Sequence, residues 1–229
     1  MAEAAASPAP TAGAPAHAPA ETLPELGAVY WRKRASAETL RNRGRLWTAW
    51  TCMTVGWFLV PAPVLLMLEP LSFPVALICF VYGWIVPELY AFRGANVTRP
   101  RRRSAKRAEE VAQGLLGDLL GHEARDLQRE TGLAMERGGL GVWLIAEGGA
   151  VLVVPGGRRV HCFCVNVPDG ELPPSDRIAH LLLALRTDEQ GFATVANHAF
   201  SGAPWRLRRR MDRRSRPALD AARREASSS

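Results

Sequence analysis

The stretch from residue 46 to residue 92 is 47 residues long and carries only two charged side chains, Glu69 and Glu88. The surface of a soluble protein normally carries charged side chains over such a length. The interior of a bilayer, in contrast, requires that charged side chains be absent. The hydrocarbon core of a bilayer is about 30 Å thick, and a helix needs about 20 apolar residues to cross it. The stretch is therefore long enough for two crossings, and it constrains the fold more than any other part of the sequence.

Residues 69–74 contain two prolines and divide this stretch into two parts, residues 46–68 and 75–92. Backbone groups find no water inside a bilayer, so each part is expected to be a helix that satisfies its own hydrogen bonds. Pro61 and Pro63 are expected to kink or weaken the first helix. The alternative is a buried hairpin in a soluble protein, which a mean hydropathy of −0.06 would allow. The length of the uncharged stretch favours a transmembrane hairpin.

The flanks of the hairpin predict its orientation. Basic residues are retained on the cytoplasmic side of a membrane, and the turn of the hairpin carries only Glu69. Both termini are therefore expected in the cytoplasm, in a multi-pass protein of the inner (plasma) membrane. An alanine-rich chain with only two lysines, Lys33 and Lys106, is typical of a bacterial proteome of high GC content. The flanking basic residues are Arg32, Lys33, Arg34, Arg41, Arg43, Arg45, Arg93, Arg99, Arg101, Arg102, Arg103, Lys106 and Arg107.

The remaining sequence divides by composition. The expected parts are a disordered Ala/Pro-rich tail (1–29), a basic juxtamembrane segment (30–45), the hairpin (46–92), a basic linker (93–103), a cytoplasmic α+β domain (104–202) and an Arg-rich tail (203–229). The fold class is thus a two-helix transmembrane hairpin with a small cytoplasmic α+β domain.

Hydrophobic periodicity predicts the elements of that domain. One helix is expected over 105–131, with Val111, Leu115 and Leu119 on an apolar stripe that Leu116, Leu120 and Leu127 widen. Three strands forming a meander are expected over 141–146, 150–154 and 158–165, and the apolar character of the first two on both faces predicts a sheet that is covered on both sides. Two helices follow, the first from Ser175 and the second with Phe192, Val195, Ala199 and Phe200 at helical spacing.

A metal site is one interpretation of His161, Cys162 and Cys164, which lie close together in sequence. Side chains alternate along a strand, so His161 faces away from the two cysteines. A second Cys/His pair at the spacing of a zinc site is also missing from the sequence. The pattern favours a core strand.

The sequence evidence for a pair of catalytic residues is as weak as the evidence for a metal site. Asp118 and His122 have the i, i+4 spacing of a helix face and could act as a general base, but a solvated polar face is the simpler interpretation. Cys164 with His180 or His198 has no local signature of a nucleophile. We therefore assign no catalytic, cofactor-binding or metal-binding residue from the sequence.

The Arg-rich tail is the one segment to which the sequence assigns a contact. Between Trp205 and Arg216, seven arginines are opposed by a single Asp212, and Trp205, Leu207 and Met211 offer apolar groups to a headgroup layer. The competing hypothesis is an RNA-binding arm, but the predicted domain itself is mildly acidic, which disfavours nucleic acid. The expected anionic-lipid contacts are Arg206, Arg208, Arg209, Arg210, Arg213, Arg214 and Arg216.

The function expected from these features is that of a membrane tether for a small binding, scaffold or regulatory domain without catalysis of its own. Its partners would be a bilayer with anionic headgroups and a protein that the sequence does not identify, and self-association is left open. Two alternatives remain. One is a membrane-associated enzyme that uses polar residues near His161 or His122. The other is a small transport or channel subunit, although the only charge within the two spans is Glu88.

Overall fold

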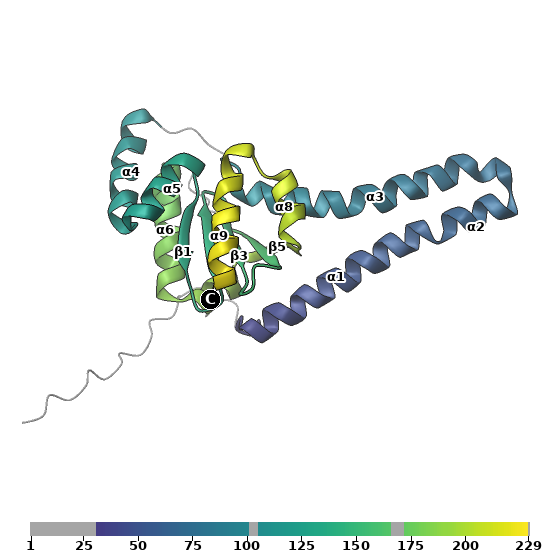
Figure 1. Cartoon of the computed structure of the whole chain (residues 1–229), viewed down its shortest axis with the longest axis horizontal. Coiled ribbons are helices and arrows are strands. Elements are labelled where there is room, and N and C mark those ends of the chain that lie inside the picture. Colours follow the sequence, from purple (N-terminus) through teal and green to yellow (C-terminus); the bar gives the residue numbers. More distant parts are fainter. Residues whose placement is uncertain (1–30, 101–104, 166–171, 229) are drawn as a thin grey trace, which may run out of the picture.

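The computed structural model describes residues 31–100, 105–165 and 172–228. Two long helical arms project from an α+β domain, converge, and are joined at their far end by a tight turn (Figure 1). The expected disordered tail, residues 1–29, lies outside the described residues.

The projecting part consists of α1 (Ala37–Leu59), α2 (Pro61–Leu68), the short 3-10 helix η2 (Pro70–Ser72) and α3 (Phe73–Ala95). The turn falls within the expected residues 69–74, and α1 gives way to α2 at Val60, next to the prolines that were expected to disturb the helix. Pro61 has no N–H to donate, which explains the interruption. Ser36 caps the start of α1 by accepting a hydrogen bond from the Thr39 backbone N–H at 3.2 Å.

The surface of these helices is apolar and exposed. In the most apolar windows of the two arms, 6% and 17% of the residues are buried, whereas the core helix of a soluble protein would be mostly buried. Large side chains such as Trp57 and Leu68 are 75% and 76% exposed. The protein therefore has two helices that are long and apolar enough to cross a bilayer.

The domain contains a five-stranded antiparallel sheet in the order β1-β2-β3-β4-β5. The expected three-stranded meander corresponds to its three central strands, so that expectation was incomplete. The strands are β1 (Ala134–Arg137), β2 (Val142–Ala146), β3 (Gly149–Val153), β4 (Val160–Cys164) and β5 (Asn197–Gly202).

The edge strand β5 replaces the second half of an expected helix. That helix ends early, as α7 (Glu189–Val195), because Ala196 adopts an extended conformation (φ −62°, ψ 142°). The chain then pairs with β4, with Cys162 opposite Phe200. The backbone hydrogen bonds of β4 and the burial of Phe200 outweigh the helical spacing of the apolar residues.

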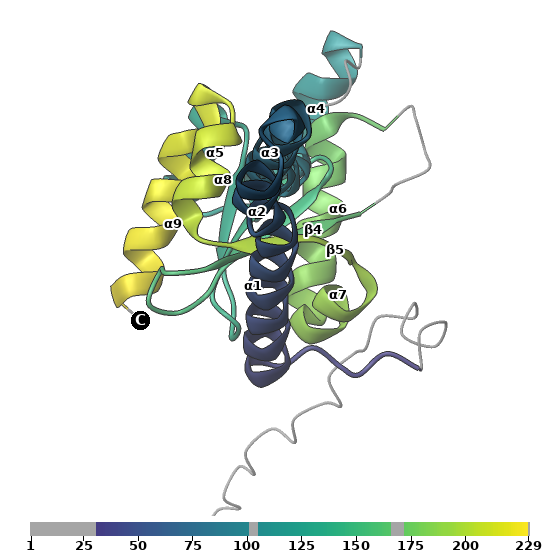
Figure 2. The same cartoon turned by 90° about the vertical axis from the view of Figure 1, so that its right-hand side faces the viewer.

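Both faces of the sheet are covered, as the sequence predicted. On one face, Trp143 and Ile145 pack with α6 (Pro174–Thr187) and with α4 (Lys106–Leu119). On the other face, Val142 and Leu144 pack with the end of α3 and with the C-terminal helices. Viewed along the projecting helices, these two layers lie on opposite sides of the strands (Figure 2).

The helix expected over 105–131 is two helices, α4 and α5 (His122–Thr131). Leu120 is extended (φ −96°, ψ 142°) and ends α4. Leu116 and Leu120 are buried, but Val111 and Leu115 are 62% and 57% exposed, because α4 packs on the domain through the neighbouring face that bears Ala112. The expected stripe is therefore confirmed at Leu116 and Leu120 and wrong at Val111 and Leu115.

The segment expected to be a separate Arg-rich tail folds against the sheet. It forms α8 (Pro204–Arg210), η4 (Arg213–Ser215) and α9 (Arg216–Ser228). Ala218, Leu219, Ala222 and Ala226 of α9 are buried in the sheet-facing core. Their spacing is that of an amphipathic helix, which explains why this end of the chain is ordered.

The expected linker 93–103 is in part structured. Beyond α3, η3 (Asn96–Thr98) buries Val97 and Thr98 against the domain. Gly94 lies so close to β5 that a Cβ atom added there would be 2.6 Å from the Cβ of Phe200. A bulkier residue at this position would hold α3 away from the sheet.

Candidate functional site

The two helices and the domain meet at a polar and aromatic contact, which we call the junction. Helix α8 lies beside α3 (Figure 1), and it makes both of the following bonds. Arg206 donates from Nη2 to the backbone carbonyl of Pro87 at 2.8 Å, and Arg210 donates from Nε to Glu88 at 2.8 Å. Glu88, the one charged residue of the expected second span, is thus neutralised by the C-terminal segment.

The other side of the junction joins α1 to the sheet. Arg159 donates from Nη1 to the backbone carbonyl of Gly44 at 2.6 Å and from Nη2 to the Thr48 hydroxyl at 2.9 Å. The ring of Trp47 lies 5.7 Å from that of Tyr90 and 5.4 Å from that of His198, measured between centroids. Both helices are therefore anchored to the domain by several independent contacts.

A pair of histidines lies beneath the junction. His161 on β4 is fully buried, and its Nδ1 is 3.1 Å from Nε2 of His198 on β5. His198 also makes a hydrogen bond to the backbone of Phe200, which leaves Nδ1 of His198 as the donor and Nε2 as the acceptor for His161. In that tautomer Nε2 of His161 is an acceptor, and it has no hydrogen-bond partner among the described residues.

Both histidines are neutral. Burial and, secondarily, the neighbouring His198 lower the pKa of His161 to about 3. Burial and the nearby Arg43 lower the pKa of His198 to about 4. The strand places His161 on the opposite face from Cys162, as the alternation of side chains predicted. This pair has the character of a core hydrogen bond, because no solvent reaches His161.

The seven arginines that were expected to contact anionic lipid differ in their surroundings. Two of them, Arg206 and Arg210, belong to the junction. Arg208 forms an ion pair with Asp220 at 2.9 Å, and Arg214 donates from Nε to the carbonyl of Glu130 at 2.7 Å. Arg216 donates from Nε to a backbone carbonyl of the same segment at 3.3 Å. Because these arginines already bond to groups of the protein, an anion would have to share their N–H donors with those partners.

Arg209 and Arg213 are exposed on the surface of this segment. The guanidinium of Arg209 lies 6.0 Å from the ring centroid of Trp205, which is 55% exposed. Leu207 and Met211, expected to reach a headgroup layer, are instead buried in the core against the sheet. Of the three apolar side chains that the sequence proposed for this role, Trp205 alone is available. The lipid contacts themselves stay a prediction.

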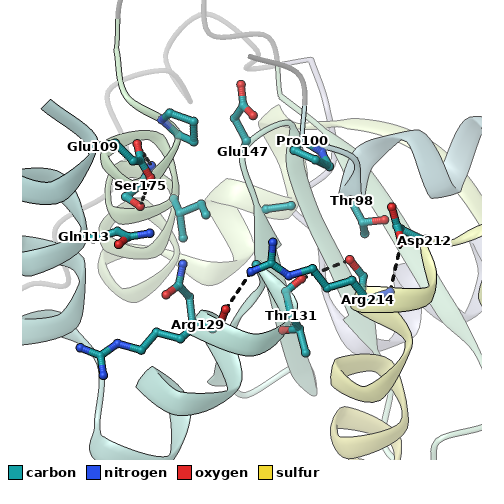
Figure 3. Close-up of a pocket in the computed structure, with 16 residues that line it drawn as sticks. Thr98, Pro100, Glu109, Gln113, Arg129, Thr131, Glu147, Ser175, Asp212 and Arg214 are labelled. Carbon is teal, nitrogen blue, oxygen red and sulfur yellow. Dashed lines mark hydrogen bonds between the residues drawn. The ribbon is translucent and has the colours of Figure 1, made fainter. Parts of the chain in front are cut away.

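A polar cavity of about 280 Å³ opens beside the end of α3 (Figure 3). Thr98 and Pro100 line it on one side, Glu109 and Ser175 on another, and Arg214 crosses its floor. The described lining contains no histidine or cysteine. Its volume is just below the range of about 300–1,000 Å³ that is typical of small-molecule sites.

Most of the polar groups around this cavity cap helices. Nε and Nη2 of Arg214 donate to carbonyls of the last turn of α5, and the hydroxyl of Ser215 donates to the carbonyl of Thr131 at 3.2 Å. The hydroxyl of Ser175 donates to Glu109 at 2.6 Å, which ties the start of α6 to α4. These contacts join the helices that surround the cavity and so stabilise the fold.

The predicted general-base pair does not come together. Asp118 and His122 lie on different helices, and Asp118 pairs instead with Arg125 at 3.6 Å. His180 is exposed on α6. Within residues 31–100, 105–165 and 172–228, no three His, Cys, Asp or Glu side chains are grouped so that they could hold a metal ion.

Sequence reasoning missed the junction. Arg159, His161 and His198 meet there, although 37 residues separate the two histidines. Nothing in the local pattern marks such a contact. The one available signal was Glu88, a lone carboxylate near the end of an apolar span, which called for a basic partner.

Comparisons with protein family models, with curated proteins and with solved structures find no match for this chain.

Proposed function

We propose that the protein is a two-span protein of the bacterial inner membrane that holds a binding or regulatory domain at the cytoplasmic face. The observation that carries the proposal is the exposed apolar surface of α1, α2 and α3. Trp57, Trp84 and Leu68 are 75%, 69% and 76% exposed. A continuous apolar surface of this extent needs a nonaqueous environment.

The dimensions support this proposal. From Thr48, the last residue of α1 that bonds to the domain, to Leu68 the helices rise about 30 Å at 1.5 Å per residue. That distance matches the hydrocarbon core of a bilayer. From Phe73 to Glu88, α3 rises about 23 Å, less than the thickness of the hydrocarbon core, so Glu88 and α8, which contacts it, would lie close to the boundary of the core on the side of the domain.

The topology and the charges support the orientation. Both α1 and α3 enter the same domain, so their domain ends lie on one side of the bilayer (Figure 1). Basic residues concentrate at that side, and the turn at the far end carries Glu69 alone. The positive-inside rule then places the domain and both termini in the cytoplasm.

A binding or regulatory role is favoured over catalysis by the state of the polar groups. His161 is buried and its pKa is lowered to about 3, His122 is exposed and lies on another helix than Asp118, and Arg214 of the cavity caps α5. The contacts at the junction also hold the domain at a fixed height above the membrane. The proposed work of the anchor is to present the domain there to its partner.

Extraction of membranes with alkaline carbonate tests the proposal. The full chain should stay in the membrane pellet, because each span contributes apolar area to the bilayer interior. A variant with Leu77→Lys and Val81→Lys should be lost from the pellet, since lysine at the centre of a span costs about 3 kcal/mol. These side chains are 51% and 45% exposed, so the change does not disturb a protein core.

The matched control places the same two changes on the domain, as Val111→Lys and Leu115→Lys, which are also exposed and four residues apart on a helix. This control should stay in the membrane. Release of the unaltered chain by carbonate would contradict membrane integration.

A further inference from the structure

An open groove of about 830 Å³ runs between α1 and α3. Its walls are apolar, with Val55 and Leu59 on the side of α1 and Phe80 and Trp84 on the side of α3. The groove lies on the part of the helices that the proposed function places in the bilayer.

The end of this groove nearest the domain is basic. Arg206 and Arg209 of α8 line it together with Trp205. Glu88 also lines it, but its carboxylate is already paired with Arg210 at 2.8 Å. The mouth of the groove therefore carries a net positive charge and favours an anion.

The length of the groove corresponds to one leaflet. From Phe80 to Glu88, α3 rises about 12 Å at 1.5 Å per residue. Half of the hydrocarbon core is about 15 Å. A leaflet-deep apolar groove with a cationic end at headgroup level has the shape and the charge pattern of one phospholipid.

We propose that the groove binds one anionic phospholipid of the cytoplasmic leaflet. This inference rests on the proposed function, because it requires the two helices to lie in the bilayer. The acyl chain lies against Val55, Phe80 and Trp84, and the phosphate lies between Arg209 and Arg206. Arg206 uses one N–H for the carbonyl of Pro87, and a guanidinium has five N–H donors, so it retains donors for a phosphate oxygen.

Two variants separate the apolar contact from the charge. Gly56 lines the groove, and a Cβ atom there would meet no atom within 4 Å, so Gly56→Leu fills the groove without a clash. Gly114→Leu on α4 is its control, since that helical glycine also faces open space. Arg209→Gln removes charge at the mouth, with exposed Arg213→Gln as its control.

The full chain is reconstituted into nanodiscs of phosphatidylcholine that contain a small share of phosphatidylglycerol of the same acyl composition. Native mass spectrometry after release into mild detergent then counts the lipids retained by each chain. We expect one retained phosphatidylglycerol per chain. Gly56→Leu and Arg209→Gln should each lower its retention about tenfold, equivalent to about 1.4 kcal/mol, and both controls should retain it.

Three results would overturn the inference. The first is that the unaltered chain retains phosphatidylcholine as well as phosphatidylglycerol. The second is that Gly56→Leu retains as much phosphatidylglycerol as the unaltered chain. The third is a lipid-free dimer that Gly56→Leu dissociates, which would identify a second copy of the chain as the occupant of the groove. The carbonate extraction distinguishes this failure from that of the proposed function. A chain that stays in the membrane yet retains no lipid refutes the lipid site alone, whereas a chain released by carbonate refutes both.

Discussion

Acidification should destabilise the domain through His161 and His198. Desolvation lowers the pKa of these side chains from 6.5 to about 3 and about 4 when the chain folds. Between those values and pH 6.5 the unfolded chain binds protons that the folded chain does not bind. The stabilisation is thus fully present above about pH 6.5 and is lost as the pH falls toward the pKa values of the folded state.

The magnitude follows from linkage. Each histidine contributes about 1.4 kcal/mol per pH unit in this range, so acidification from about pH 6.5 to about pH 5 costs about 2 kcal/mol per histidine. The two together cost on the order of 4 kcal/mol. For a chain of this length, 1 kcal/mol corresponds to about 2–4 °C in Tm, so Tm should fall by on the order of 10 °C.

Thermal unfolding in detergent, followed by tryptophan fluorescence, measures this shift. The variant His161→Phe with His198→Leu should lose most of the pH dependence between these two pH values, whatever its absolute stability. The control His180→Gln, which alters an exposed histidine, should retain the dependence of the unaltered chain. An equal fall of Tm in the unaltered chain and in the double variant would refute the reasoning.

The remaining predictions concern stability, measured as the shift in the denaturant midpoint in detergent. Glu189→Ala should cost about 3 kcal/mol, because its carboxylate accepts from Trp143 Nε1 at 2.6 Å and from two backbone N–H groups; a change below 1 kcal/mol would contradict this. Gly94→Leu should cost about 2 kcal/mol or more through the clash with Phe200, and a neutral effect would show that α3 does not dock there. Arg214→Ala should cost about 1–2 kcal/mol through the lost cap of α5; a loss no greater than that of Arg213→Ala would remove this role.

The hairpin was predictable because composition alone determines it. An uncharged stretch of this length has few alternatives, and a turn with two prolines fixed its position at residues 69–74, where the structure has η2. The interruption of the first helix followed from Pro61 in the same local way. These features depend on no distant part of the chain.

The edges of the domain were not predictable from local pattern. Strand β1 has only four residues, Ala134–Arg137, which is too short for alternation to be visible. Phe200 matched the spacing of a helix, but it lies in β5 because β4 offers an open edge and α3 covers it at Gly94. Such choices are decided by tertiary contacts.

The C-terminal segment shows a different reason for error. The density of arginines there suggested a separate tail that contacts anionic lipid, but the spacing of Ala218, Leu219, Ala222 and Ala226 already described a buried helix face. Long arginine side chains can cover an apolar surface and still reach their partners. Arg208 does so with Asp220 and Arg210 with Glu88.

Site-specific labelling of single cysteines tests the central claim most directly. In a background without Cys52, Cys79, Cys162 and Cys164, one cysteine is placed in the hairpin turn as Leu71→Cys, at a side chain that is 86% exposed. A second chain carries Ser228→Cys at the exposed end of α9. With an impermeant thiol reagent, Leu71→Cys should react in intact cells and Ser228→Cys only after lysis. Labelling of Ser228→Cys in intact cells, with Leu71→Cys protected until lysis, would contradict the account.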